Sequence, residues 1–510
     1  MAQFGLEHWL WEPGVVGSNP TAPTMKIEKI GTATIFIHQS FQLKNIGRDR
    51  MFYYKNVLCV YPHQKGIPEK KYCPPIGLEY IATVLEGLVE KVTLIDMRFE
   101  LKLDDFIEDD NIDLVCLSVN WDYQRDAAIN IITRIPSNIK VIVGGRYATV
   151  SVEELFAAAS NIDIIVRGDG EEIIWDIASG LPLREISGIS YREGGRIIHN
   201  KTRDLSSLND AVYPNRKMRR VNYRLLYKNI DLGLNIDFIS TSRGCPYNCK
   251  FCTFTNNPLG QKRSWNGRSA RSVVEELKTI DAEFIFVVDD NFAADMKRVE
   301  EICDLIIAEG IKKIFVVALR LEIYKYPQIL KKMFQAGFKI LSIGIESAQD
   351  KTLKTMQKGF DVALAERAFS EIRKINFYNH GYFIVGCIGE SESEMLEIAP
   401  FAKRLKLDTI NLSLLRTEKY SPLNELIAKS RGYYVGEGNI IYSEEYPLER
   451  LRSIRHRISR SYYKFPAMLR ITKKIFTAHI IKFRYLVKLI VIFFLGGILN
   501  NKRRKYQTYS

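Results

Sequence analysis

The chain lacks several features that would place it outside the cell or across a membrane. Residues 1–24 have no basic start followed by an apolar run, so they do not read as a signal peptide. The uncharged apolar run at residues 489–499 is shorter than the about twenty residues that a spanning helix needs. The eight cysteines show no secreted disulfide pattern. These absences predict a protein of the reducing cytoplasm.

Acidic residues are missing from residues 450–510. Sixteen of the 73 Lys and Arg lie there, which leaves 57 basic residues against 59 acidic ones in the rest of the chain. The net charge of +14 therefore belongs to a basic tail, and the body of the protein is near neutral. No basic groove is indicated, and nucleic acid is an unfavoured partner. With 510 residues, 46% hydrophobic and 26% charged, the chain predicts two or three globular domains.

Three cysteines, Cys245, Cys249 and Cys252, lie at spacings of four and three residues. Iron-sulfur clusters normally take four cysteine ligands, so a site with three leaves one iron open to a small molecule. Structural zinc needs a closed set of four ligands, and no His or further Cys lies between Cys252 and Cys303. Zinc completed from a distance and plain buried cysteines remain alternatives, although the intervening Pro and Asn indicate an irregular loop. A metal-binding loop is the favoured interpretation.

The stretch CPYNCKFC resembles the CxxxCxxC signature of the radical S-adenosylmethionine (SAM) enzymes, including the aromatic Phe251 before the third cysteine. In that family a 4Fe-4S cluster binds the amino and carboxylate groups of SAM at its open iron. Reductive cleavage of SAM then yields a 5'-deoxyadenosyl radical. The resemblance implies a partial barrel of β/α units and an external electron donor such as a flavodoxin or ferredoxin.

Before the cysteine loop, short apolar runs alternate with helical patterns from residue 55 to about residue 180. Each run is apolar throughout, which is typical of buried parallel strands, so a doubly wound Rossmann-like α/β sheet is predicted. Such sheets bind ligands at the carboxyl ends of their strands, where glycines let backbone amides approach closely. The expected strands are 56–62, 91–97, 112–120, 140–145 and 162–168, and the expected helices are 76–88, 104–109, 125–135 and 151–158.

The order of these motifs is similar to the cobalamin-binding domain that precedes the barrel in one branch of the radical SAM family. Two positions depart from the pattern. Tyr61 stands where the Asp of the Asp-x-His-x-x-Gly loop would orient an axial ligand, so His63, although followed by Gly66, is not expected to ligate cobalt. Tyr147 stands where the branch usually has His. The residues that the resemblance assigns to cobalamin are Gly77, Ser118, Gly144, Gly145, Gly168, Asp169, Gly170 and Glu171.

From residue 237 to about residue 435 the alternation resumes, with the cysteine loop directly after its first strand. Six units predict a partial (β/α)6 TIM-type barrel, whose chemistry would lie at the carboxyl ends of the strands. The expected strands are 237–241, 284–290, 313–320, 339–347, 380–386 and 408–415, and the expected helices are 269–279, 297–309, 327–336, 362–374 and 391–403.

The carboxyl ends of these strands are polar, and singly each polar residue could be a solvated loop or a helix cap. The resemblance assigns them to SAM. Arg320 is expected to contact a carboxylate of SAM or of a substrate, with a structural salt bridge as the equal alternative. The residues assigned to SAM are Phe251, Asp289, Asp290, Asn291, Glu346, Ser347 and Gly386.

Five segments are therefore expected. Residues 1–24 resemble a translated transfer-RNA gene end, so we expect a native start at Met25. Residues 25–180 form the cobalamin-binding domain, 181–236 a connector with a hairpin turning at Gly194 and Gly195, and 237–435 the radical SAM barrel. Residues 436–510 form a basic, partly apolar helical tail. Its segment 450–505 is expected at an anionic membrane surface on the cytoplasmic side, with packing onto the barrel as the alternative.

The resemblance implies a cobalamin-dependent radical SAM methyltransferase acting on an unactivated carbon of a lipid-like molecule or other secondary metabolite. The catalytic residues themselves are not identified by the sequence. A cobalamin-dependent radical cyclase or oxidoreductase is the alternative within the same fold. A non-catalytic regulator that binds zinc or cobalamin is the alternative from another class.

Overall fold

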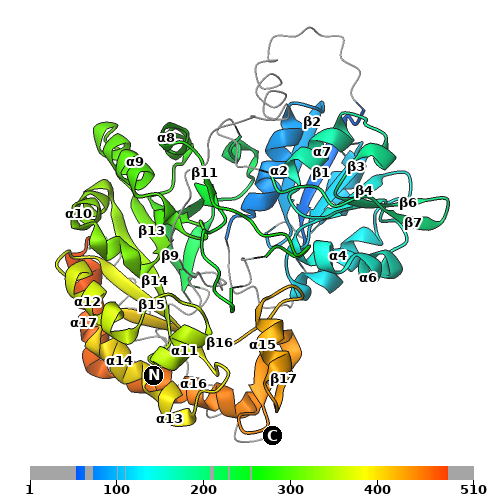
Figure 1. Ribbon diagram of the computed structural model, residues 1–510. Helices are drawn as coiled ribbons and strands as arrows, with labels where there is room; N and C mark the ends of the chain where they lie inside the picture. Colours follow the sequence, from blue (N-terminus) through cyan, green and yellow to red (C-terminus); the bar gives the residue numbers. More distant parts are fainter. Residues whose placement is uncertain are drawn as a thin grey trace, which may run out of the picture.

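The computed structural model describes residues 53–63, 73–99, 102–109, 111–206, 212–227, 230–252 and 256–480. Within them the chain forms two open, mostly parallel sheets with helices packed on them, followed by further C-terminal helices (Figure 1). The predicted start at Met25, the loop glycine Gly66 and the apolar run 489–499 lie outside the described residues.

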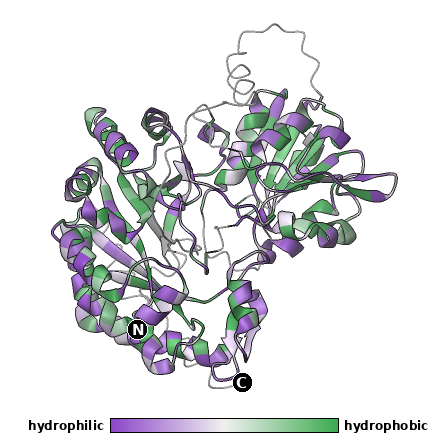
Figure 2. Cartoon of the chain, viewed as in Figure 1, coloured by the Kyte–Doolittle hydropathy of each residue, from purple (hydrophilic) through white to green (hydrophobic). Residues whose placement is uncertain are grey.

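The first sheet has the order β2-β1-β3-β4-β5-β6-β7, and its first five strands are parallel. This order is that of a doubly wound sheet, in which the carboxyl edge between β1 and β3 is the topological switch point. The five strands predicted from their apolar runs are all present, and Figure 2 shows them as predominantly hydrophobic. The strands are β1 (Asn56–Tyr61), β2 (Lys91–Asp96), β3 (Leu114–Ser118), β4 (Lys140–Gly144), β5 (Ile164–Val166), β6 (Ile189–Glu193) and β7 (Arg196–His199).

Helices cover both faces of this sheet, because apolar side chains project from each strand in both directions. One buried cluster joins the sheet to α2 and α7, and a second joins its other face to α3, α4 and α6. Two helices, α5 and α7, were not predicted, since each begins directly after glycines that were expected to form a loop. The helices are α2 (Ile76–Glu86), α3 (Asp104–Asp109), α4 (Arg125–Ile132), α5 (Arg146–Val150), α6 (Val152–Ala158) and α7 (Glu171–Ala178).

The predicted hairpin at Gly194 and Gly195 is present as β6 and β7. It does not belong to a separate connector, however, because β6 pairs antiparallel with β5 and extends the first sheet. The expected boundary at residue 180 therefore lies inside the first structural unit. The pairing of β5 with β6, which α7 separates in the chain, depends on tertiary contact and cannot be predicted from either run of residues alone.

The second sheet has the order β16-β15-β14-β13-β12-β9-β8, with six parallel strands and the antiparallel β8 at one edge. It curves into the predicted partial barrel with its helices outside (Figure 1). Its strands are β8 (Arg224–Tyr227), β9 (Ile230–Ile239), β12 (Phe284–Val287), β13 (Ile314–Leu319), β14 (Phe338–Glu346), β15 (Tyr378–Val385) and β16 (Thr409–Leu414).

Four of the helices between these strands begin with a capping side chain: Ser269, Asp295, Asp361 and Ser391 each accept a backbone N–H of the first turn. The last predicted helix is divided at Glu397 into two. The barrel helices are α8 (Ala270–Thr279), α9 (Met296–Ala308), α10 (Pro327–Ala336), α11 (Asp350–Thr355), α12 (Val362–Ile372), α13 (Glu392–Leu396) and α14 (Ile398–Arg404).

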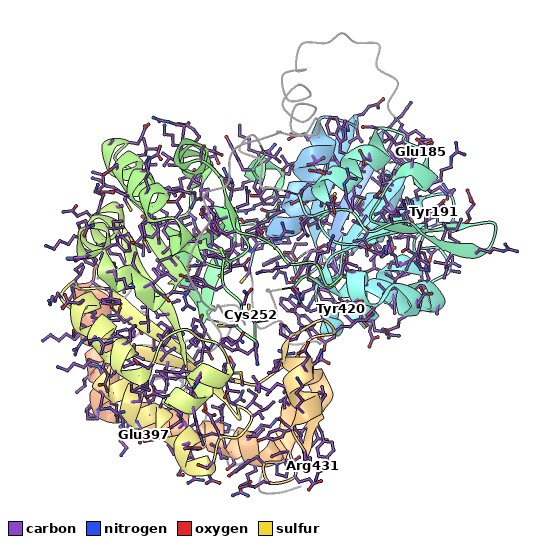
Figure 3. The ribbon with its side chains drawn as sticks, viewed as in Figure 1. Glu185, Tyr191, Cys252, Glu397, Tyr420 and Arg431 are labelled. Carbon is purple, nitrogen blue, oxygen red and sulfur yellow. The ribbon has the colours of Figure 1, made fainter. Side chains whose placement is uncertain are left out.

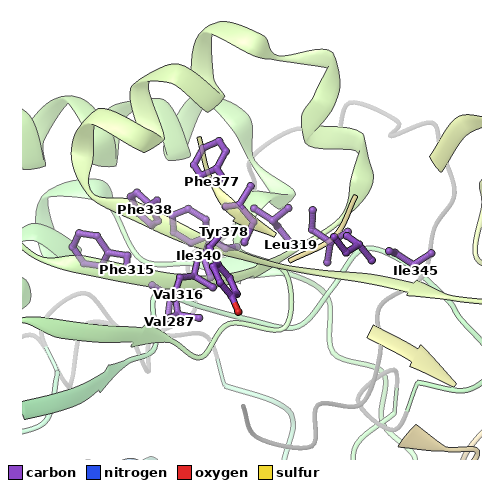
Figure 4. Packing of buried hydrophobic residues seen from close by; sticks show 14 of the residues in the cluster. Val287, Phe315, Val316, Leu319, Phe338, Ile340, Ile345, Phe377 and Tyr378 are labelled. Carbon is purple, nitrogen blue, oxygen red and sulfur yellow. The ribbon is translucent and has the colours of Figure 1, made fainter. Parts of the chain in front are cut away.

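The barrel core lies between the sheet and these helices. Phe315, Phe338 and Phe377 lie on the helix-facing side of the sheet, whereas Val316 and Tyr378 lie on the other side (Figure 4). The rings of Phe315 and Phe338 stack with centroids 4.7 Å apart. The two faces of each strand therefore have different tasks, one to pack helices and the other to line the barrel.

The C-terminal region packs around the open side of the barrel. The basic helix α16 (Leu448–Tyr462) buries Leu451, Ile454 and Ile458, and the Tyr462 hydroxyl donates to the carbonyl of Leu407 at 2.5 Å. Packing onto the barrel, the alternative interpretation of this segment, is therefore correct for α16. No described helix is long and apolar enough to cross a membrane. The remaining elements are α15 (Leu423–Lys429), β17 (Tyr433–Val435), β18 (Ile441–Ser443) and α17 (Phe465–Thr477).

Candidate active site between the two sheets

The cysteine loop follows β9 and lies between the two sheets, where Figure 3 labels Cys252. Cys249 and Cys252 are buried and Cys245 is partly buried. The loop is braced by the turn after α11, since the backbone N–H of Lys250 donates to the carbonyl of Met356 at 3.1 Å. The Cys249 thiol lies 3.5 Å from the carbonyl oxygen of Gln357.

The three thiols lie close enough to influence one another electrostatically. Burial raises the pKa of Cys245 to about 12 and that of Cys249 to about 12, and Cys252 adds to both shifts. Among the described residues no three His, Cys, Asp or Glu surround a single ion position.

Two buried cations, Arg320 and Lys358, face the thiols. Both oppose the effect of burial on the pKa of Cys249, because a nearby positive charge favours the thiolate. Arg320 also lies over the ring of Tyr247, with 4.2 Å between the guanidinium carbon and the ring centroid. The two cations therefore offset part of the effect of burial on Cys249, whose pKa nevertheless stays above its ordinary value.

Arg320 does not reach out as a free substrate contact. Its guanidinium forks onto Glu322 at 2.6 and 2.9 Å and donates to the carbonyl of Lys358 at 2.8 Å. The structural salt bridge, one of the two interpretations of this residue, is therefore present. Its position beside Tyr247 and Cys249 still brings its charge to the cluster loop.

Glu346 at the end of β14 is the most constrained residue of the candidate SAM site. Its φ is 77°, a left-handed conformation that is unfavourable outside glycine, and the register of β14 against β15 shifts at this point. One carboxylate oxygen accepts from Lys358 at 2.8 Å, and the other is buried without a partner in the described structure. An unpaired buried acceptor is what a ribose hydroxyl would satisfy, so Glu346 fits the contact that the resemblance implies.

The three polar residues that follow β12, Asp289, Asp290 and Asn291, differ in their hydrogen-bond partners. Asp289 accepts from the Thr241 backbone N–H and the Ser242 hydroxyl, both at 2.6 Å, and from the Thr241 hydroxyl. It is therefore engaged in holding the strand end before the cysteine loop. Asp290 accepts from the Gly244 N–H at 2.7 Å, and burial raises its pKa to about 6.

Asn291 is 1% exposed, and neither atom of its amide has a partner in the described structure. Because an unpaired buried amide costs free energy, this side chain fits a polar ligand. Among the residues predicted for SAM, Asn291 and Glu346 are the two whose buried polar atoms have no partner in the described structure.

The other residues predicted for SAM, Ser347, Gly386 and Phe251, have no buried polar side-chain atom that lacks a partner in the described structure. Ser347 donates to Glu390 at 2.6 Å and so joins the loops after β14 and β15. Gly386 has a φ of 84°, and a Cβ there would meet Leu451 of α16 at 2.9 Å, so its bare face is turned to that helix. Phe251 is buried in a small core with Cys249, Cys252 and Ile384.

The carboxyl edge of the first sheet brings together the residues predicted for cobalamin. Gly145 has a φ of 107°, and a Cβ there would lie 2.5 Å from the Val119 carbonyl oxygen, so only glycine fits. Ser118 accepts from the Asn120 amide at 2.9 Å beside it. Gly77 and Gly144 lie at the same edge, and neither would suffer a close contact from a side chain.

The acidic residues of the fifth strand's loop are not open toward a ligand. Asp169 pairs with Arg263 and Glu171 pairs with Arg243, and both arginines belong to the second domain. A Cβ built at Gly168 would lie 3.5 Å from Leu259, and one built at Gly170 would lie 2.9 Å from Ile81. The cobalamin contact of these glycines stays a prediction, whereas both carboxylates are paired with arginines.

His63 and Tyr61 lie beside a buried arginine at this edge. Arg98 is stacked over the Tyr61 ring at 4.4 Å and pairs with Asp96 at 2.6 Å. Burial and then the Arg98 charge lower the pKa of His63. The ring of Tyr61 therefore contacts Arg98. Tyr147 donates to Glu154 at 3.0 Å.

A small pocket opens between the two domains beside the third cysteine. It is lined by Arg146 of α5, Cys252 and Tyr420 among others, and Figure 3 labels the last two in this region. Arg146 approaches Glu418 at 3.8 Å across it. The carboxyl edge of the first sheet thus meets the cysteine loop of the second.

Sequence patterns alone did not reveal four residues of this site. Lys358 follows a short helix twelve residues after its partner Glu346, and Glu390 pairs with Ser347 across two loops. Arg243 and Arg263 reach the first domain. Each depends on a contact between distant segments, so no local pattern could have identified the pairing.

Comparison with known protein families agrees with this geometry. The family model of the radical SAM superfamily matches residues 239–402, and the B12 binding domain model matches residues 69–178. The chain therefore carries a B12-binding domain ahead of a radical SAM domain. These two domains indicate an enzyme that uses SAM and cobalamin.

Individual relatives match most of the chain. The chain is 27% identical to the uncharacterized methyltransferase PH0819 of Pyrococcus horikoshii over 80% of this chain and 91% of that protein. It is 23% identical to an anaerobic magnesium-protoporphyrin IX monomethyl ester cyclase of Cereibacter sphaeroides, over 72% of this chain and 63% of that protein.

Among solved structures, the methyltransferase TsrM from Kitasatospora setae superposes with a TM-score of 0.60 at 18% identity, over 80% of this chain and 82% of that one. The enzyme OxsB superposes with a TM-score of 0.55 at 21% identity, over 80% and 56%. At these identities the likeness shows the shared fold.

Proposed function

We propose that this chain is a cobalamin-dependent radical SAM methyltransferase that acts on an unactivated carbon of a small molecule. The observation that supports this proposal most directly is the contact between the carboxyl edge of the first sheet and the cysteine loop. The carboxyl edge that holds Gly145 and Ser118 lies against the loop that holds Cys252, with Arg146 and Tyr420 at the junction. A methyl carrier and a radical-generating cluster placed on these edges would both reach one substrate.

In this proposal the bound cofactors supply radical generation and methyl transfer, and the chain supplies position and environment. Cys245, Cys249 and Cys252 would hold the cluster, with Arg320 favouring the thiolate forms of Cys245 and Cys249 and Lys358 that of Cys249. Glu346 and Asn291 would bind polar groups of SAM through their unpaired atoms. Gly144 and Gly145 would let backbone approach the corrin side chains. An external flavodoxin or ferredoxin would deliver the electron.

The first test is anaerobic purification followed by assays of iron, sulfide and cobalt. We expect about four irons and four sulfides per chain and near-stoichiometric cobalt. Cys252→Ser should lose the cluster, whereas Cys303→Ser, at a buried cysteine of α9 outside the loop, should keep it. Zinc in the absence of iron and sulfide would exclude the enzyme and favour the regulator.

The second test is incubation of the loaded enzyme with methyl-labelled SAM and candidate substrates. Transfer of the labelled methyl group to product supports the methyltransferase. Product formed without the label would instead support a radical cyclase or oxidoreductase. That alternative is favoured by the similarity to the magnesium-protoporphyrin ester cyclases, although the chain spans only about 63% of their length.

We also propose that α17 contacts an anionic membrane surface, which would bring the enzyme to a lipid-like substrate. Phe465 is 75% exposed and Leu469 is 58% exposed on one side of this helix. Lys464 and Lys473 are exposed nearby, and no acidic residue occurs from residue 450 onward. Apolar side chains flanked by cations are typical of helices that lie in a membrane interface. The hopanoid C-3 methylase of Methylococcus capsulatus, 26% identical over 56% of this chain, is a related enzyme.

A further inference from the structure

Two ion pairs connect the loop after β5 to the segment that carries the cluster cysteines. Glu171 pairs with Arg243, and Asp169 pairs with Arg263. Both carboxylates belong to the first domain, on the loop assigned to cobalamin, and both arginines belong to the second. We call these two pairs the latch.

The arginines stand on either side of the cysteine loop. Arg243 lies two residues before Cys245 and directly after the strand end that Asp289 holds. Arg263 lies eleven residues after Cys252, in a turn closed by the Asn257 side chain, which accepts from the Gln261 backbone N–H at 2.9 Å. The latch therefore grips both ends of the cluster segment.

Neighbouring contacts complete this junction. The Gln261 amide donates to the Arg203 carbonyl at 2.8 Å, and Leu259 lies 3.5 Å from the position of a Cβ at Gly168. The Arg263 guanidinium also donates to the Ser206 carbonyl at 3.0 Å. The turn after the cluster loop is thus seated directly on the cobalamin loop.

The environment of the latch favours charged partners. The four side chains are between 15% and 23% exposed, so solvent screens them less than it would a surface pair. Burial alone would raise the pKa of Glu171, yet Arg243 holds that pKa below its ordinary value. The Arg243 guanidinium also lies 5.6 Å from the centre of the Tyr80 ring of α2.

General adhesion of the domains does not require these pairs. A separate buried network behind the barrel joins Glu79 of α2 to Arg219 and Asp237, with distances of 2.7 Å. Arg216 extends it to Asp237 and Glu276. Because that network already joins the domains, the latch has a local effect at the cofactor loops.

We propose that the latch fixes the position of the cluster segment relative to the cobalamin loop and thereby sets the separation of the two cofactors. Its residues are positioning residues, since their charged groups are paired with each other rather than turned to a ligand. The separation matters because the radical formed at one cofactor and the methyl group held at the other must reach the same carbon. This inference rests on the proposed function for the presence of both cofactors.

The experiment uses the full chain with Asp169→Asn and Glu171→Gln combined, and Glu185→Gln as a control at an exposed pair of the same domain. Iron and cobalt are assayed, and pulsed electron paramagnetic resonance then measures the dipolar coupling between the reduced cluster and cob(II)alamin. We expect the latch variant to load both cofactors but to show a weaker or broader distribution of couplings. Unchanged coupling would overturn the proposal.

A second measurement does not depend on the cofactors. Hydrogen exchange of the cofactor-free protein should become about fivefold faster at residues 168–171 in the latch variant, and unchanged in the Glu185→Gln control. Reversing one pair, with Glu171→Arg combined with Arg243→Glu, should restore slow exchange. Unaltered exchange in the latch variant would contradict the proposal, whether or not the wild type binds cobalt. Absence of cobalt from the wild type would count against the proposed function instead.

Discussion

Glu346 has a backbone conformation that its own chemistry does not favour. Its φ of 77° costs roughly 1–3 kcal/mol for a residue with a Cβ, so the surrounding contacts must hold it in place. The buried ion pair with Lys358 is the principal contact that does so. The strained backbone and the unpaired oxygen occur in the same residue, at the carboxyl end of a barrel strand, which is where chemistry is expected.

The ion pair of Glu346 and Lys358 leads to the first prediction. Lys358→Met leaves the buried carboxylate, whose pKa is already raised by burial, without its cation, and should destabilise the barrel by about 3–5 kcal/mol. Adding Glu346→Gln should recover much of this loss, because the uncompensated charge is removed. Urea unfolding of the single and double variants measures both effects. Additive losses would show that the two side chains do not interact.

At the scale of single elements, each barrel strand has two faces with separate tasks. The helix-facing side of β13 and β14 packs Phe315 against Phe338, and Figure 4 shows this apolar layer. The opposite side carries polar groups such as His380, whose pKa burial lowers to about 3. The turns that follow the strands, rather than the strands themselves, decide where backbone comes close to a ligand.

The turn between β4 and α5 supports the second prediction. Gly145→Ala should destabilise the first domain by about 1–3 kcal/mol, because it combines a positive φ with a contact of 2.5 Å to a backbone oxygen. Gly77→Ala is the matched control at the same sheet edge. No atom lies within 4 Å of its Cβ position, so it should be neutral or slightly stabilising. Thermal unfolding of both variants compares them, and equal effects would contradict this geometry.

The start of β16 supports a third prediction, which concerns pH. Asp408 is 4% exposed and accepts from the Asn379 N–H at 2.8 Å, and burial raises its pKa from 3.8 to about 6. A raised pKa means that the folded state holds its proton more tightly. The stability contributed by the protonated form is complete below about pH 4 and is lost as the pH rises through about 6.

Asp408→Asn should therefore be more stable than the wild type at pH 7 by about 2–3 kcal/mol, with the difference vanishing near about pH 4. Lys474 and Arg470 of α17 reduce this effect because both favour the carboxylate. Urea unfolding at a series of pH values gives the difference. A stability difference independent of pH would show that Asp408 does not titrate in this range.

At the scale of the whole molecule, two domains from separate segments of the chain together form the candidate site. The network of Glu79, Arg219 and Asp237 joins them on one side, and Arg146 and Glu418 approach each other on the other. The C-terminal helix α16 packs on α13, α14 and the edge strand β16, so that its apolar residues are buried. The exposed apolar residues of α17 remain for contact with a surface outside it.

The membrane proposal gives the fourth prediction, made for the full chain. It should sediment with vesicles that contain anionic phospholipid and bind at least about tenfold less to neutral ones, because the attraction depends on basic residues. Phe465→Ser combined with Leu469→Ser should weaken binding to the anionic vesicles. Ile307→Ser, at a residue of α9 that is 45% exposed, serves as the control. Equal binding by both variants would exclude α17 as the contact.

Features that depend only on residues close together in the chain can be predicted from the sequence itself. The cluster cysteines lie within eight residues, and the buried strands are continuous apolar runs, so local spacing and period predicted the cofactor class and both sheets. The same holds for the caps of the barrel helices, which need only a neighbouring backbone N–H.

The tertiary structure alone decided which charges meet. Asp169 and Glu171 looked like ligand residues from their loop, but arginines more than seventy positions away occupy them. Asp289 and Ser347 likewise bind distant polar groups of the protein. Each buried polar group must find a partner, and which partner it finds depends on how the whole chain folds, because hydrogen bonds and ion pairs act through space rather than along the sequence.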